Sequence, residues 1–154
     1  MSENMSTILS RLKESSATLN QLCDRGADSI RDLEEFLAKE CSVGIEASVP
    51  VWSEEDEYHG ESLSLRYARW GNQFRVLLEW SDSSVPSPHD TSCKPWAECK
   101  REDKLLTLPK LADLLEAIEV ELNLRVSKAA AAIEQIAQIS PPTPRKKGGN
   151  DVAK

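Results

Sequence analysis

The chain has 154 residues, of which 40% are hydrophobic and 29% are charged, and this composition is typical of one globular domain. Its formal net charge is −7, so it lacks the positive charge from which nucleic-acid binders gain non-specific affinity. No stretch approaches the roughly 18 consecutive apolar residues of a membrane span, and the N-terminus lacks the order of a signal peptide. These properties predict a cytoplasmic protein without a nucleic-acid or membrane partner.

The apolar and small residues between positions 5 and 36 recur at alternating steps of three and four. This heptad-like period keeps one face of a helix against a partner helix. Gly26 interrupts the run, and glycine costs a helix interior about 1 kcal/mol relative to alanine, so we expect a kink or short break near residues 24–28. The apolar and small residues that follow this heptad-like period are Met5, Ile8, Leu12, Ser15, Leu19, Leu22, Gly26, Ser29, Leu33 and Phe36.

Three segments then show the period of two that is typical of half-buried strands, at residues 43–52, 62–70 and 73–80. Gly71 and Asn72 predict a two-residue hairpin between the second and third strands, since both tolerate the positive φ of tight turns. Pro50 lacks a backbone N–H, so the first strand is predicted to lie at a sheet edge or to carry a bulge at its end. The expected core-facing residues of the other two strands are Leu63, Leu65, Tyr67, Phe74, Val76, Leu78 and Trp80.

A segment rich in Ser and Pro follows at 81–95 and is predicted to be irregular, with a short fourth strand around 96–99. Helical periodicity returns from Lys104 to about Ile139. Thr107 is the expected N-cap, and Pro109 is acceptable in the first turn, where its missing N–H is harmless. The prolines after position 140 end the helix. We therefore predict a single domain at 1–140 and a disordered basic tail at 141–154.

The predicted fold class is α+β, with two long helices packed on one face of a three- or four-stranded antiparallel meander in the order α-β-β-β-(β)-α. Each helix reaches about 50 Å, whereas the strands reach only about 25–30 Å. The apolar faces that extend beyond the sheet must be covered, and we expect the two helices to cover each other as an antiparallel pair. If the fourth strand exists, this pairing places Leu33 and Phe36 near Leu108 and Leu111. Such a pair can extend to a second subunit, so a homodimer is predicted.

The segment from His89 to Cys99 concentrates the residues that could carry chemistry. Structural zinc sites use pairs of ligands two to four residues apart. Here three residues separate His89 from Cys93 and five separate Cys93 from Cys99, and a fourth ligand would have to come from Cys41 or His59. The favoured interpretation is that Cys41 and Cys99 are small core residues and that His89 is an exposed loop residue. We predict no metal, no cofactor and no catalytic residue.

The sheet face that points away from the helices is the predicted binding surface. It is expected to carry tryptophan and arginine, which are the residue types most enriched in binding hot spots. Three alternatives stay open: the loop that contains Trp96 folds over this face, a second subunit covers it, or a different protein binds there. The predicted binding residues are Trp52, Arg66, Trp70, Arg75, Leu77 and Trp96.

The junction "WAECKREDKLLTLPKLADLLEAI", from Trp96 to Ile118, resembles one in small uncharacterised bacterial and phage proteins of the helix-βββ-helix type. In those proteins a tryptophan or leucine, a Glu, a small residue and a basic-acidic "RE" lead into a leucine-rich helix. The resemblance covers about a third of the chain and implies a bacterial or phage origin and no activity. Type III secretion chaperones are similar in general character only, as small, acidic, dimeric α/β proteins that bind unfolded effector segments.

These observations together predict a non-enzymatic, dimeric protein-binding or adaptor protein that is chaperone-like in general character. The alternative is a small enzyme or ligand-binding module with a site between the sheet and residues 81–99. In that case the available reactive side chains are His59, His89, Cys93 and Cys99.

Overall fold

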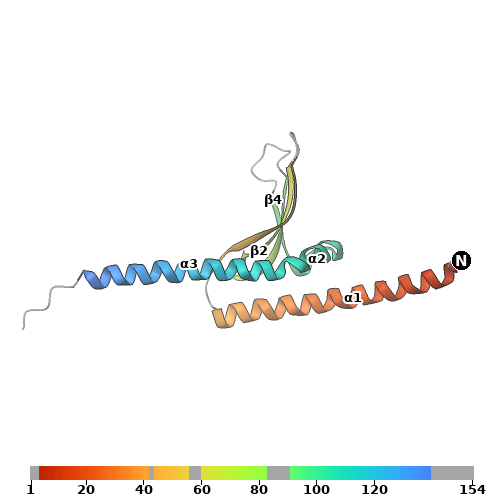
Figure 1. The fold of residues 1–154 in the computed structure, drawn as a ribbon, viewed down its shortest axis with the longest axis horizontal. Coiled ribbons are helices and arrows are strands. Elements are labelled where there is room, and N and C mark those ends of the chain that lie inside the picture. Colours follow the sequence, from red (N-terminus) through yellow and green to blue (C-terminus); the bar gives the residue numbers. More distant parts are fainter. Residues whose placement is uncertain (1–3, 42–43, 56–59, 83–90, 140–154) are drawn as a thin grey trace, which may run out of the picture. The chain divides into compact units, whose positions relative to one another are not determined.

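The structure of the chain is a computed structural model that describes residues 4–41, 44–55, 60–82 and 91–139 (Figure 1). The chain divides into two compact units, unit 1 at residues 1–121 and unit 2 at residues 122–154. A first long helix, a four-stranded antiparallel sheet and a second helical region follow one another along the sequence. This order confirms the predicted α+β class.

Helix α1 spans Met5–Phe36, and a short π-helical segment, Leu37–Cys41, continues it. The side chain of Asn4 caps its start by accepting a hydrogen bond from the backbone N–H of Ser6 at 3.1 Å. Of the predicted kink or short break near residues 24–28, the break is wrong, because α1 is continuous through Gly26.

The sheet consists of β1 (Ala47–Glu55), β2 (Gly60–Trp70), β3 (Gln73–Asp82) and β4 (Thr91–Pro95), each paired with the next in sequence order. Gly71 and Asn72 form the predicted two-residue hairpin, and Gly71 has the positive φ, 66°, that the turn requires. Strand β1 lies at an edge of the sheet and its register shifts between Pro50 and Trp52. The proline predicted an edge position or a bulge at the end of the strand; the structure has the edge position, and its irregularity lies within the strand.

The fourth strand and the second helical region both begin earlier than predicted. Pairing of β4 ends at Pro95, which has no N–H to donate, and the expected strand at 96–99 is a 3₁₀ turn, Trp96–Glu98, followed by Cys99. Helix α2 spans Arg101–Thr107, and a 3₁₀ turn at Leu108–Lys110 joins it to α3, Leu111–Gln138. Thr107 is therefore not the predicted N-cap, and its side chain makes no capping hydrogen bond.

The core lies on the sheet face that the helices cover. Alternate residues of β2, namely Leu63, Leu65 and Tyr67, are 1–3% exposed, and Val76 and Leu78 of β3 are fully buried, as the period of two predicted. The helical segments contribute Ile30, Leu37, Trp96, Leu114 and Ile118 to the same cluster, and Cys99, which follows the 3₁₀ turn, also belongs to it.

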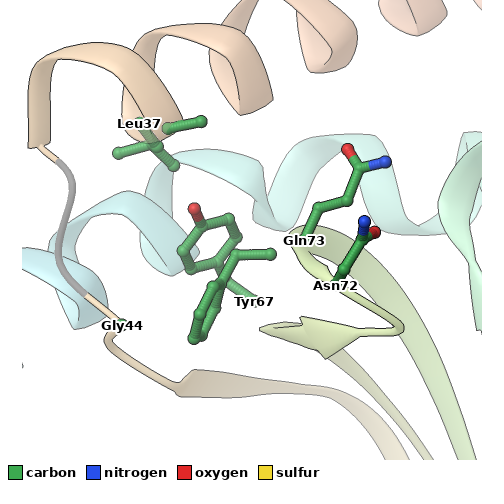
Figure 2. A pocket seen from close by; sticks show the side chains of 7 residues that line it. Leu37, Gly44, Tyr67, Asn72 and Gln73 are labelled. Atoms are coloured by element: carbon green, nitrogen blue, oxygen red, sulfur yellow. The ribbon is translucent and has the colours of Figure 1, made fainter.

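Helix α1 crosses the strands instead of running along them. Near its C-terminal end, Leu37 lies beside Tyr67 of β2 (Figure 2). One turn earlier, Glu34 accepts a hydrogen bond from the backbone N–H of Val76 in β3. Two further turns earlier, Gly26 meets Leu108. Moving back along α1 therefore leads from β2 to β3 and then to the segment that follows β4.

Because of this crossing, α1 and α2 run in the same direction. Leu19 of α1 shares a pocket with Arg101 and Leu105 of α2, whereas Gly26, two turns later in α1, meets Leu108, which directly follows α2. The predicted antiparallel alignment is wrong for these helices of unit 1. It assumed helices laid along the strands, whereas the chain that leaves β4 reaches the middle of α1 and not its end.

Gly26 allows the close approach of Leu108 to α1. A Cβ atom placed on Gly26 would lie 2.9 Å from Cδ2 of Leu108 and 3.0 Å from its Cδ1. These separations are shorter than the usual contact of about 3.5–4.0 Å between carbon atoms. The helix-propensity cost of the glycine is thus offset by a tight contact between α1 and the turn after α2.

We expect Gly26→Ala to raise the free energy of unfolding by less than the gain of about 1 kcal/mol in helix propensity, or to lower it, because the added Cβ must displace the methyl groups of Leu108. In a Leu108→Ala background the same change should raise the free energy of unfolding by about 1 kcal/mol, since the clash is gone. Urea unfolding of the four proteins measures both effects. Equal effects in the two backgrounds would contradict the contact.

Candidate functional site

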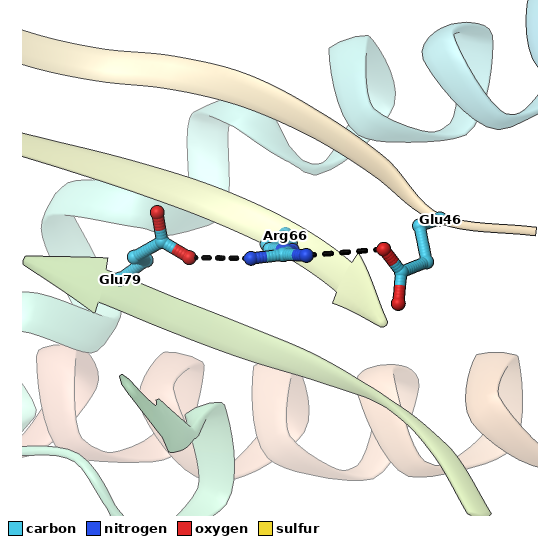
Figure 3. A network of polar contacts seen from close by, with 3 residues as sticks. All are labelled: Glu46, Arg66 and Glu79. Atoms are coloured by element: carbon cyan, nitrogen blue, oxygen red, sulfur yellow. Dashed lines mark hydrogen bonds and ion pairs between the residues drawn. The ribbon is translucent and has the colours of Figure 1, made fainter. Parts of the chain in front are cut away.

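The sheet face that points away from the helices carries an ion-pair network centred on Arg66 of β2 (Figure 3). Its Nη1 donates to Oε2 of Glu79 at 2.7 Å, and its Nη2 donates to Oε2 of Glu46 at 3.1 Å. The hydrogen bond to Glu79 is the main reason why the pKa of Arg66 is raised above its ordinary value. Arg66 is therefore on the predicted face, but two carboxylates of the same chain already occupy its guanidinium group.

Leu77 and Trp70 lie on the same face as Arg66 but differ in accessibility. Leu77 pairs with Arg66 across β2 and β3 and is 2% exposed, and Ala68 on the same face is also buried. Trp70 is 40% exposed next to the hairpin. Of the apolar side chains predicted for this binding surface, Trp70 is thus the accessible one.

Trp52 lies on the helix-covered face of the sheet and not on the predicted one. Ser48 and Pro50 pair with Arg66 and Ser64, but after the irregularity at Val51 it is Trp52 that pairs with Leu63, a core residue. One extra residue in a strand reverses the side to which the following side chains point. The bulge therefore moves Trp52 to the core side, where it is partly buried.

Trp96 belongs to the core and does not cover the outer face of the sheet. It is 1% exposed, and its indole Nε1 donates a hydrogen bond to Oγ1 of Thr107 at 2.9 Å. The Thr107 hydroxyl in turn bonds to the backbone carbonyl of Asp103 at 2.8 Å. The ammonium group of Lys104 lies 5.2 Å from the centre of the Trp96 ring. Trp96 therefore anchors α2 to the sheet.

Arg75 is directed toward α1 by Glu34, a residue that the sequence reading did not single out. Glu34 accepts from the Arg75 Nε at 3.4 Å and from the backbone N–H of Val76 at 3.1 Å, and its side chain is 16% exposed. Since β4 pairs only with residues 77–81 of β3, the Val76 N–H lies on an edge without a neighbouring strand. The sequence did contain a signal for this role of Glu34. Its position, four residues after Ile30 and three before Leu37, places its carboxylate on the core-facing side of the helix.

The alternative site between the sheet and residues 81–99 is described only in part. Ser92, Lys94 and Asp103 line a pocket of about 260 Å³ beside Trp80 and Cys99, whereas His59 and His89 lie outside the described residues. Within the described ranges, no three His, Cys, Asp or Glu side chains are placed to hold a metal ion.

The thiols of this region are poor nucleophiles. Burial first, and Asp103 second, raise the pKa of Cys99 to about 11, and its thiol donates to the carbonyl of Pro95 at 3.2 Å. Burial and then Glu79 also raise the pKa of Cys93. Since the thiolate is the reactive form, these cysteines do not fit nucleophilic catalysis. The interpretation of Cys99 as a small core residue is confirmed by its burial.

The first half of α1 exposes a line of large apolar side chains, which we call the α1 seam. Its members are 41–68% exposed, whereas the helix face becomes buried from Cys23 onward. Isolated exposed apolar residues are normal, but a periodic line of them marks an interaction surface. The α1 seam consists of Met5, Leu9, Leu12, Leu19 and Leu22.

Unit 2, taken by itself, also exposes apolar residues at helical spacing. Val126, Ile133 and Ile136 of α3 are 58–67% exposed, and Ala129 lies between the first two at the steps of a heptad. No helix in the described part of the chain is long and apolar enough to cross a bilayer.

In comparisons of sequence and fold, no protein-family model, no curated protein and no solved structure matches this chain. The resemblance of the Trp96–Ile118 junction to bacterial and phage proteins thus stays a prediction.

We expect Glu34→Ala to lower the free energy of unfolding by about 1–3 kcal/mol, because it leaves the Val76 N–H and the Arg75 guanidinium without their acceptor. The matched control is Glu35→Ala, which removes an exposed carboxylate from the next position of the same helix. Urea unfolding of both variants and the parent measures the difference. Similar effects of the two substitutions would refute the role of Glu34.

We expect Thr107→Val to destabilise unit 1 by about 1–3 kcal/mol, since the buried indole N–H of Trp96 then lacks an acceptor. Thr107→Ser keeps the hydroxyl and should cost less. In a Trp96→Phe background the two substitutions should converge, because no indole donor remains. Thermal and urea unfolding, followed by circular dichroism, measures the stability of these variants. If Thr107→Val is as stable as the parent, the hydrogen bond between Trp96 and Thr107 does not stabilise the protein.

Proposed function

We propose that the chain is a non-enzymatic protein-binding protein that forms a homodimer through the α1 seam. The observation that carries this proposal is the exposure of five large apolar side chains at heptad-like spacing on one helix face. Full burial of such a side chain is worth about 1.5–3 kcal/mol, so the isolated chain leaves considerable stabilisation unused.

Two properties of the α1 seam indicate that the molecule that covers it is a second copy of the chain. The seam continues the face that packs on the sheet from Cys23 onward, so it has the chemistry of a core and not of a polar recognition surface. Residues 5–22 also carry only Arg11, Lys13 and Glu14 as charged side chains, although the whole chain has a net charge of −7. Two copies of this segment can therefore approach without the like-charge repulsion expected elsewhere.

The exposed Trp70 and the face around Arg66 provide a separate surface on which an adaptor could bind another protein. This part of the proposal rests on residue type and exposure, since tryptophan is enriched in hot spots. The Arg66 network is already satisfied by Glu46 and Glu79, so a partner would gain little from displacing it. A cytoplasmic location and a bacterial or phage origin stay predictions of the sequence.

Sedimentation velocity at micromolar concentrations tests the dimer. We expect the parent to sediment as a dimer and the Leu12→Glu/Leu19→Glu variant as a monomer with unchanged far-ultraviolet circular dichroism, because charge on the seam opposes its burial. The control is Ser10→Glu/Ala17→Glu, which adds the same charge at exposed positions of α1 off the seam and should stay dimeric.

Two outcomes would contradict this proposal. A parent protein that is strictly monomeric would refute the homodimer. A seam variant that remains dimeric, while Ile133→Glu becomes monomeric, would assign the dimer contact to unit 2 and not to the α1 seam.

A further inference from the structure

A pocket of about 330 Å³ lies between the C-terminal end of α1 and the β2–β3 hairpin (Figure 2). This volume is within the range of about 300–1,000 Å³ that is typical of small-molecule sites. Leu37 and Ala38 line it from the helix side, and Phe74 lines it from β3. The pocket lies entirely within unit 1 and is independent of the α1 seam.

The hydroxyl group of Tyr67 is the unusual feature of this pocket. Tyr67 is 3% exposed, yet its hydroxyl has no hydrogen-bond partner among the residues that the structure describes. Buried polar groups are nearly always paired, and an unpaired one costs stability. In Figure 2 the hydroxyl points toward the end of α1 where Leu37 lies. Because the hydroxyl borders the pocket, water can accept its hydrogen bond, and a ligand with an acceptor atom can take the place of that water.

The electrostatic surroundings keep this hydroxyl protonated. Burial is the main cause of the raised pKa of Tyr67, and the negative charge of Glu34 adds to it. The group is thus a hydrogen-bond donor at neutral pH, in need of an acceptor atom.

The rest of the pocket combines an apolar wall with two amide groups. The Phe74 ring lies 5.7 Å from the Tyr67 ring, centre to centre, and presents aromatic surface. The side-chain amides of Asn72 and Gln73 point toward the same side as the Tyr67 hydroxyl (Figure 2). No lysine or arginine lines the pocket in the described part of the chain, so an anion would lack a counter-ion and would meet the field of Glu34.

We propose that this pocket binds a small, uncharged aromatic molecule that carries a carbonyl group. The ring packs against Phe74 and Leu37, the carbonyl oxygen accepts the hydrogen bond of Tyr67, and the amides of Asn72 and Gln73 bind the polar edge of the ligand. A charged carboxylate of the same size binds more weakly, because no positively charged side chain of the pocket lining compensates for the loss of its hydration.

The test uses the full chain with two matched probes, 2-naphthamide and 2-naphthoate, which differ in charge but hardly in shape. Backbone amide signals in nitrogen–proton correlation spectra report binding by residue. We expect the amide probe to shift the signals of Gly44, Asn72 and Phe74, and the carboxylate to bind at least tenfold more weakly.

Tyr67→Phe removes only the hydroxyl and should weaken the amide probe about tenfold, as expected for the loss of one hydrogen bond. The control is Thr18→Val, which removes an exposed hydroxyl of α1 outside the pocket and should bind like the parent. Without a probe, Tyr67→Phe should melt at about the same temperature as the parent, because no hydrogen bond between two described residues is lost.

Several results would overturn this inference. They are unchanged spectra with the amide probe, equal affinity of Tyr67→Phe and the parent, and equal affinity for the two probes. A melting temperature several degrees lower for Tyr67→Phe alone would mean that the hydroxyl is already paired in the native protein. Ala38→Leu narrows the pocket from the helix side, so tight binding of the amide probe to this variant would also exclude the site.

Discussion

A four-stranded sheet can support only part of a 32-residue helix that crosses it, and the main features of unit 1 follow from this limit. Strands lie about 4.8 Å apart, so the sheet is roughly 15 Å wide, which matches about ten residues of helix. The packed residues Ala27, Ile30, Leu33 and Leu37 cover this length. Everything N-terminal to the Cys23 turn has no sheet beneath it, although its apolar period continues.

Two groups of charged side chains in unit 1 contact exposed parts of the sheet. Glu34 covers the edge of β3 where β4 provides no partner, and Arg66 joins carboxylates that flank it on the outer face. The buried Cys99 remains a thiol because its anion would be poorly solvated. In the described part of the chain, Glu34, Arg66 and Cys99 therefore make contacts that support the fold.

The sequence patterns predicted the local structure well and the relations between elements poorly. The period of two identified the core face of β2 and β3, and Gly71-Asn72 identified the hairpin, because both depend on neighbouring residues. The irregularity at Val51 moved Trp52 to the core side. Pro50 indicated an edge position or a bulge, but the period of two could not show which side chains a bulge would reverse. The parallel course of α1 and α2 and the pocket at Tyr67 depend on how distant segments meet, so no local pattern encodes them.

The distribution of aromatic residues gives the two units different optical properties. All four tryptophans and both tyrosines precede Leu122, and neither phenylalanine follows it. Intrinsic fluorescence and near-ultraviolet circular dichroism therefore report on unit 1 alone. Far-ultraviolet circular dichroism also records the helical residues of α3 in unit 2. Any difference between the two signals during unfolding measures how strongly the end of α3 is coupled to the sheet, without the introduction of a label.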